Sequence, residues 1–187
     1  MLKQRIGSPA SCEKRIELNN AFRKLWEEHV MWTRSFIIST AADLGDLPYV
    51  TARLLRNPQD FAKEFQKYYG AEHAKKFAQL LTEHLTIAAE LVNAAKAENK
   101  EAADNARKKW YQNADEIAEF LSSINPYWNK RAWQSMLYNH LKITEQEAAL
   151  RLSGQYAADV ALFDEIETQA LDMADFMTLG IMKQYNL

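Results

Sequence analysis

Apolar residues recur along most of the chain at intervals of three and four, which is the period of an amphipathic α-helix. In the first such stretch two apolar stripes run side by side, so this helix is expected to be long and well buried. Ser11 is a suitable N-cap for it, and Gly45 can adopt the left-handed backbone that closes a last helical turn. The pattern therefore predicts a first helix that begins after Ser11 and stops at Gly45.

Five further helices are predicted from the same periodicity and from the turn residues between them. They run from near Asp46 to Gly70, over about residues 72–98, from the turn at residues 98–100 to Asn125, over about residues 127–153, and onward from Gly154. Pro58 lies inside the second of these stretches, so that helix must kink or restart there. Because short turns make consecutive helices antiparallel, the predicted fold class is an all-α antiparallel bundle of about six helices, in a single helical domain over residues 1–187.

The predicted turns suggest an internal repeat. Gly45, Asn99 and Gly154 are 54 and 55 residues apart, and a fixed spacing of this kind is typical of repeated units. We therefore expect three copies of one helical hairpin, at about residues 13–70, 71–125 and 126–187.

Three of the four histidines occupy equivalent positions in these hairpins. The segments LWEEHV, LLTEHL and MLYNHL align around His29, His84 and His140, at offsets of 55 and 56 residues. Each histidine falls on an apolar stripe and lies 14 to 16 residues before its turn. Because a helix rises about 1.5 Å per residue, all three should lie at one level of the bundle. The sequence therefore predicts a buried polar layer that contains three imidazoles.

The second helix of each hairpin shares a pattern of amide, two free positions, acid, apolar residue and alanine. Its amides are Asn57, Asn113 and Gln169, and its acids are Asp60, Glu116 and Asp172. These side chains fall near the level of the histidines, so each histidine is expected to hydrogen-bond an amide or a carboxylate across its hairpin. For Asn57 a second interpretation is equally strong, because an Asn before Pro58 also suits the N-cap of a restarted helix.

The composition argues against several classes of fold and of binding partner. With 5 Gly and 4 Pro among 187 residues, the chain has too few turn residues for a sheet-rich fold. Its 23 basic and 25 acidic side chains provide no field that would favour nucleic acid or an anionic membrane. No apolar run reaches the roughly 18 residues of a membrane span, and the single Cys12 excludes an internal disulfide and a cysteine-based zinc site. We therefore expect a cytoplasmic protein that binds neither nucleic acid nor membrane.

The polar layer is a candidate metal site, because inward imidazoles and carboxylates are the groups with which helical bundles bind metals. The expected ligands are the aligned histidines and the nearby carboxylates: His29, His84, His140, Glu28, Glu83 and Glu116. Such a set would bind a divalent ion such as iron, manganese or zinc. The chain has no Glu-x-x-His, His-x-x-x-His or His-Glu-x-x-His motif, so the ligands would have to come from different helices.

Two other functions are compatible with the same pattern. In the first, the layer only sets the helix register of a non-catalytic interaction or scaffold protein, which could form a homodimer through an exposed apolar stripe. In the second, the bundle encloses a pocket for an apolar or aromatic ligand. The chain has no nucleophile elbow, no Gly-rich phosphate loop and no βαβ alternation, so no reaction is predicted.

Other polar and aromatic residues have ordinary interpretations. Arg34 is expected to be solvated, with a pair to an inward acid as the alternative. Glu147 lies on or near an apolar stripe and is expected at a helix end or edge. The five tryptophans lie mostly at helical spacing, which favours core packing over a ligand cage.

The paired residues Glu28-His29-Val30-Met31-Trp32 and Asn139-His140-Leu141 resemble those of small all-helical bacterial proteins with a ferritin-like, duplicated helical-hairpin build. Because interior Glu and His bind metal in that superfamily, the resemblance implies metal-binding roles for Glu28, His29, Glu83, Glu116 and His140. The di-iron sites of ferritin-like proteins use Glu-x-x-His on two helices. Since this chain lacks that spacing, the resemblance does not extend to a di-iron oxidase.

Overall fold

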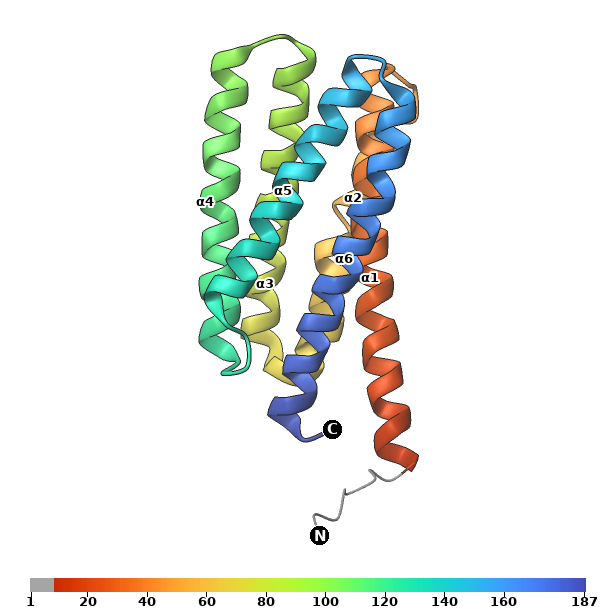
Figure 1. Ribbon diagram of the computed structural model, residues 1–187. Coiled ribbons are helices and arrows are strands. Elements are labelled where there is room, and N and C mark those ends of the chain that lie inside the picture. Colours follow the sequence, from red (N-terminus) through yellow and green to blue (C-terminus); the bar gives the residue numbers. More distant parts are fainter. Residues whose placement is uncertain (1–8) are drawn as a thin grey trace.

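The computed structural model describes residues 9–187, and all of its regular elements in that range are α-helices (Figure 1). This part of the chain contains five long helices and one short helix: α1 (Pro9–Ala41), α2 (Leu47–Leu54), α3 (Asn57–Lys96), α4 (Lys100–Ile124), α5 (Lys130–Leu152) and α6 (Tyr156–Tyr185). The predicted all-α bundle is confirmed. Short turns join the later part of α3, α4, α5 and α6, so each of these runs antiparallel to the next (Figure 1).

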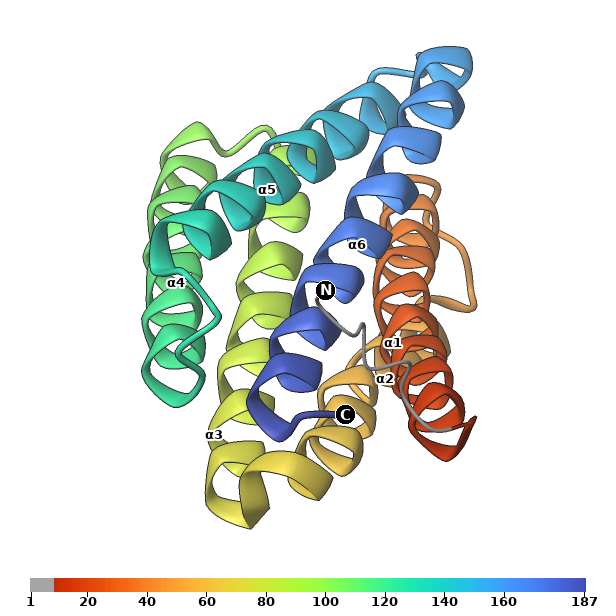
Figure 2. The same cartoon turned by 60° about the horizontal axis from the view of Figure 1, so that its bottom comes forward.

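The helices form a bundle in which α1, the later part of α3, and α5 rise in the same direction (Figure 1). Helix α4 returns beside α3, and α6 returns beside both α1 and α5. Seen from below, α5 crosses over the other helices at an angle, between α4 and α6 (Figure 2). The three rising helices carry the three aligned histidines, so their shared direction puts equivalent side chains at comparable heights.

The two ends of helix α1 differ from the predicted ones, because more than one residue near each end is suited to a helix terminus. Helix α1 begins at Pro9 rather than after Ser11, and it ends at Ala41 rather than Gly45. The left-handed backbone near this end belongs to Asp43, with φ of 50°, because Asp tolerates that conformation better than most residues.

The region predicted as a second helix is divided at the proline. Helix α2 ends before Asn57-Pro58, where α3 begins, so the restart at Pro58 is confirmed. The predicted helix end at Gly70 is confirmed, because α3 consists of two helical parts that meet at a kink there, with φ of 75° and ψ of 173° at that glycine. Glycine is suited to this position because it reaches a positive φ without a steric penalty.

The core is rich in aromatic side chains. Large and fully buried residues include Trp128, Trp133, Phe22, Phe61, Phe65 and Phe77. A smaller apolar cluster, with Phe36, Ile37 and Leu54 among its members, joins α1 to α2 near the upper end of the bundle in Figure 1. Most of the buried aromatic side chains therefore belong to the main core, whereas the smaller cluster is largely aliphatic.

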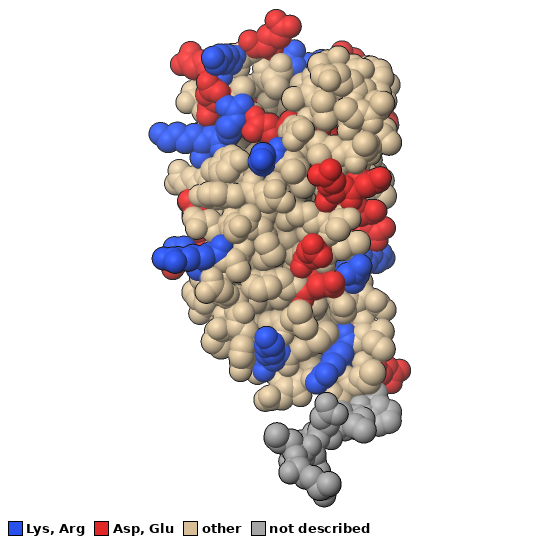
Figure 3. All heavy atoms as spheres, in the orientation of Figure 1, with Lys and Arg blue, Asp and Glu red and all other residues tan. Residues whose placement is uncertain are grey.

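The charged surface is mixed. On the face shown in Figure 3, basic and acidic side chains both occur, with broad neutral areas between them. Within residues 9–187 no helix is long and apolar enough to span a membrane.

Close packing at Gly180 provides a test of the fold. A Cβ at this residue of α6 would lie 2.0 Å from Nε1 of Trp128, which is buried and donates a hydrogen bond to the Met177 carbonyl at 3.1 Å. We expect Gly180→Ala to lower the free energy of unfolding by about 1–3 kcal/mol, because the indole cannot move without losing that bond. Urea denaturation would measure this, with Gly45→Ala as the control, since a Cβ there meets nothing within 4 Å. Equal midpoints for the two variants would contradict the packing described.

Candidate metal centre

The three aligned histidines meet inside the bundle. His29 on α1, His84 on α3 and His140 on α5 are each 2% exposed. Their ring centroids are 5.7, 6.1 and 6.3 Å apart, so the imidazoles form a nearly equilateral triangle. One ring nitrogen from each histidine lies within 4.8 Å of one ring nitrogen from each of the other two. The predicted burial and common level of the histidines are confirmed.

Each imidazole is held by an amide from the following helix of its hairpin. Nδ1 of His29, His84 and His140 lies 3.1, 3.0 and 3.1 Å from the side-chain oxygens of Asn57, Asn113 and Gln169, respectively. The same amides donate from nitrogen to backbone carbonyls, at Leu25, Leu80 and Met136. Each of these carbonyls is four residues before a histidine, so it also accepts the histidine's own backbone N–H in the helix. The amide thereby clamps the ring to its own helix.

Asn57 is a core amide and not an N-cap. It is fully buried against His29, whereas the N-cap position of α3 belongs to Arg56, which makes no side-chain cap bond. Of the two interpretations open for Asn57, the capping one is therefore wrong. The hydrogen bond to a buried imidazole explains the choice, since a buried ring N–H needs an acceptor.

The amide contacts determine which ring nitrogen carries hydrogen. A backbone carbonyl can only accept, so each amide must direct its NH₂ group to the carbonyl and its oxygen to the histidine. An amide oxygen can also only accept, so Nδ1 of each imidazole is the N–H donor. In the neutral ring the lone pair then lies on Nε2. Within residues 9–187, each imidazole makes its side-chain hydrogen bond through Nδ1, which leaves Nε2 available for a ligand.

The environment keeps all three rings neutral. Burial lowers the pKa of His29 to about 4, although its bond to Asn57 acts in the opposite direction. Burial and the neighbouring His29 lower the pKa of His84 to about 3. The same effects, with His84 added, hold the pKa of His140 well below its ordinary value. At neutral pH the centre therefore presents three unprotonated imidazoles, the form that binds metals.

Aromatic and aliphatic side chains enclose the centre. The ring of Trp26 contacts His29 edge-on at 5.6 Å between centroids, and Trp110 lies 5.3 Å from His84. A narrow cavity borders all three histidines and is otherwise lined by apolar side chains, Trp133 among them. The volume of this cavity is about 10 Å³, which is room for a small ion or a water.

The donor set fits a small transition-metal ion after a modest contraction. A tetrahedral ion bound by imidazoles at about 2.0–2.1 Å requires its nitrogens to be about 3.4 Å apart. The nitrogens here lie within 4.8 Å of one another, so the rings would have to approach by at most about 1.4 Å per pair. Neutral imidazole is a good ligand for zinc, copper, iron and nickel, whereas manganese prefers carboxylates.

The carboxylates expected near the histidines are engaged elsewhere. Within residues 9–187 the cluster of potential ligands contains the three histidines and no carboxylate. Glu28 forms an ion pair with Arg53 at 3.0 Å. Glu83 accepts a hydrogen bond from Gln79. Glu116, an exposed residue, accepts one from Gln112. The structure thus brings together the histidines but not the glutamates.

A second buried polar group joins α1, α5 and α6. Arg34 donates to Glu147 and to both oxygens of Asp159, at 2.7 and 3.2 Å for the latter. Arg151 also reaches Asp159, at 3.3 Å. The expectation of a solvated Arg34 and an edge position for Glu147 was wrong, because both acids are at most 1% exposed and the guanidinium neutralises them. The position of Glu147 on an apolar stripe was the available signal.

Comparisons of this chain with known protein families, with curated proteins and with solved structures find no match. The resemblance to ferritin-like proteins stays a prediction.

Proposed function

We propose that this protein binds one divalent metal ion, preferably zinc, through Nε2 of His29, His84 and His140. The observation that supports this most strongly is the convergence of three buried, neutral imidazoles whose Nδ1–H groups are all committed to amides. Ligating histidines commonly donate their other ring N–H to such a partner, which orients the ring and fixes the tautomer. Without an ion, the Nε2 lone pairs of the three neutral imidazoles would repel one another.

The donor set favours zinc over the other expected metals. Three imidazoles without a carboxylate resemble the protein ligands of catalytic zinc sites, which keep a fourth position for water. A bound ion of this kind would act as a Lewis acid and would lower the pKa of a water at that position. The amides orient the rings without contributing negative charge, so a bound ion would retain its full charge and favour an anion at the fourth position.

We also infer that the three ligands come from three copies of one hairpin. Each hairpin contributes the same set of contacts: a histidine, an amide 28 or 29 residues later, and a carbonyl four residues before the histidine. The repetition in both sequence spacing and hydrogen bonding supports duplication of a single unit. An approximately threefold metal site is a natural product of such a repeat.

Metal binding is testable by stability and stoichiometry. We expect purified protein, treated with chelator and then with Zn²⁺, to bind one ion per chain and to gain about 2.7 kcal/mol at a free metal concentration 100 times the dissociation constant. For a chain of this size that gain raises the melting temperature by about 5–11 °C. Cobalt in place of zinc should produce the visible absorption of a four-coordinate ion.

Two histidine variants separate a ligand role from a general effect of substitution. His84→Leu should abolish the response to Zn²⁺ and to chelator. His73→Leu, at the exposed fourth histidine, should retain both. If His84→Leu does not fold, Asn113→Ala replaces it, with metal affinity expected to fall by about 10–100-fold. A wild-type melting temperature that neither Zn²⁺ nor chelator changes, or an equal response of wild type and His84→Leu, would refute the proposal.

A further inference from the structure

A larger apolar cavity lies directly above the three histidines. Its lining includes Thr33, Ala88 and Thr144, which are four residues after His29, His84 and His140, respectively. Four residues correspond to about 6 Å along a helix, so this cavity begins one turn above the histidine layer. Trp110 links the histidine layer to this cavity, since its ring contacts His84 and also lines the cavity.

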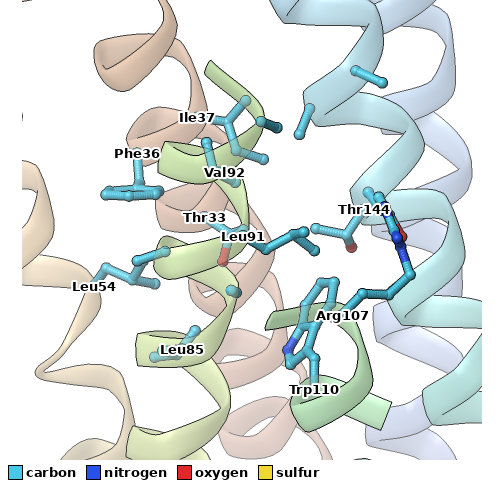
Figure 4. Close-up of a pocket in the computed structure, with 16 residues that line it drawn as sticks. Thr33, Phe36, Ile37, Leu54, Leu85, Leu91, Val92, Arg107, Trp110 and Thr144 are labelled. Carbon is cyan, nitrogen blue, oxygen red and sulfur yellow. The ribbon is translucent and has the colours of Figure 1, made fainter. Parts of the chain in front are cut away.

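The size and polarity of the cavity suit a single aromatic ring. Its volume is about 190 Å³ and most of its 16 lining residues are apolar, Phe36, Ile37 and Leu91 among them (Figure 4). An engineered protein cavity of about 150 Å³ with a similar lining binds benzene. The two charged residues of the lining, Arg107 and Glu145, pair with each other at 2.5 Å. A neutral occupant is therefore favoured over a charged one.

One hydroxyl in the lining needs a partner. Thr33 and Thr144 occupy equivalent positions, but only the Thr33 hydroxyl donates to the carbonyl four residues earlier, at 2.7 Å. The Thr144 hydroxyl is buried and finds no hydrogen-bond partner within residues 9–187. Figure 4 shows this side chain pointing from α5 toward the middle of the cavity. The buried N–H of Trp110 likewise finds no partner in the described part of the chain.

We propose that this cavity binds a small neutral aromatic molecule with a hydroxyl or carbonyl oxygen, of the size of a simple phenol. The ring fills the apolar space between Phe36 and Trp110, and the oxygen hydrogen-bonds the Thr144 hydroxyl. A buried polar group without a partner is costly, so a ligand that supplies one gains affinity over a ligand that does not. The inference does not require a metal at the histidines, and it places such a ligand next to that centre.

Titration calorimetry on chelator-treated, full-length protein tests this with two probes, p-cresol and toluene. They share a ring and a methyl group and differ in the hydroxyl. We expect p-cresol to bind the wild type at least as tightly as toluene. In Thr144→Val the ratio of the two affinities should shift by about tenfold toward toluene, because the phenol oxygen loses its partner while the shape of the cavity is kept.

Two further variants complete the test. Thr33→Val removes the equivalent hydroxyl, which is already bonded to its own helix, and should leave the affinity ratio unchanged. Ala148→Leu projects into the cavity and should weaken both probes by tenfold or more, with circular dichroism and thermal melting as checks that the fold persists. The proposal fails if neither probe binds the wild type up to its solubility limit, if Ala148→Leu binds both probes unchanged, or if both valine variants shift the ratio equally.

Discussion

Metal-free protein is expected to lose stability steeply as the pH falls from 6.5 to 4.5. The three imidazoles are buried as neutral groups, with the pKa of His29 lowered to about 4 and that of His84 to about 3. In the unfolded chain the same groups titrate at about 6.5. Between these values the unfolded state binds more protons than the folded state, so stability rises with pH and is lost on acidification.

The size of this effect approaches the stability of a whole domain. The difference for His29 alone corresponds to about 3.4 kcal/mol, a large part of the roughly 5–15 kcal/mol of a typical domain, and the lowered pKa values of His84 and His140 act in the same direction. Glu147 acts in the opposite direction, because burial raises its pKa to about 7 even though Arg34 lowers it. That carboxyl adds stability as the pH falls from about 7 to 4.5, because the folded state takes up one proton there. The three imidazoles outweigh it, because the unfolded chain takes up three protons.

Urea denaturation in the presence of chelator, at several pH values from 7.5 to 4.5, would measure the balance. We expect His84→Leu to reduce the slope of stability against pH by about 1.4 kcal/mol per pH unit, the value for one proton. The exposed His73 serves as the control, and His73→Leu should keep the wild-type slope. A stability that stays constant between pH 6.5 and 4.5 would show that the imidazoles are not buried as neutral groups.

Arg34→Met is expected to cost about 3–5 kcal/mol at neutral pH. The substitution keeps much of the side-chain volume but leaves Glu147, at most 1% exposed, without its guanidinium partner, and leaves Asp159 with Arg151 alone. Removing one partner of a buried ion pair has this cost because the charge of the other partner stays buried without compensation. The loss should shrink as the pH falls below 7, where Glu147 takes up a proton.

An exposed ion pair supplies the matched control. Arg23 pairs with Asp175 at 2.7 Å, but both side chains are more than a third exposed, so Arg23→Met should cost at most about 1 kcal/mol. Chemical denaturation of both variants at pH 5.5 and 8 would separate the two cases. Equal losses for Arg23→Met and Arg34→Met would mean that the network of Arg34, Glu147 and Asp159 is not buried as described. Combining Arg34→Met with Glu147→Gln and Asp159→Asn should recover part of the loss.

The sequence by itself determined the class of fold and the membership of the histidine layer. The period of apolar residues shows which face of each helix is buried, and this depends only on local geometry. Because the rise per residue is constant, equal distances from the turns were enough to place His29, His84 and His140 at one level. The amides at Asn113 and Gln169 followed from the same spacing.

Only the tertiary structure decided what meets at that level. The rotation of a helix about its axis and its distance from its neighbours result from the packing of all side chains together. A difference of a few ångströms therefore separates three rings that share a centre from three that merely share a height. Glu28 and Glu83 lie next to histidines in sequence, yet one position corresponds to about 100° around a helix, which turns them away from the centre to Arg53 and Gln79.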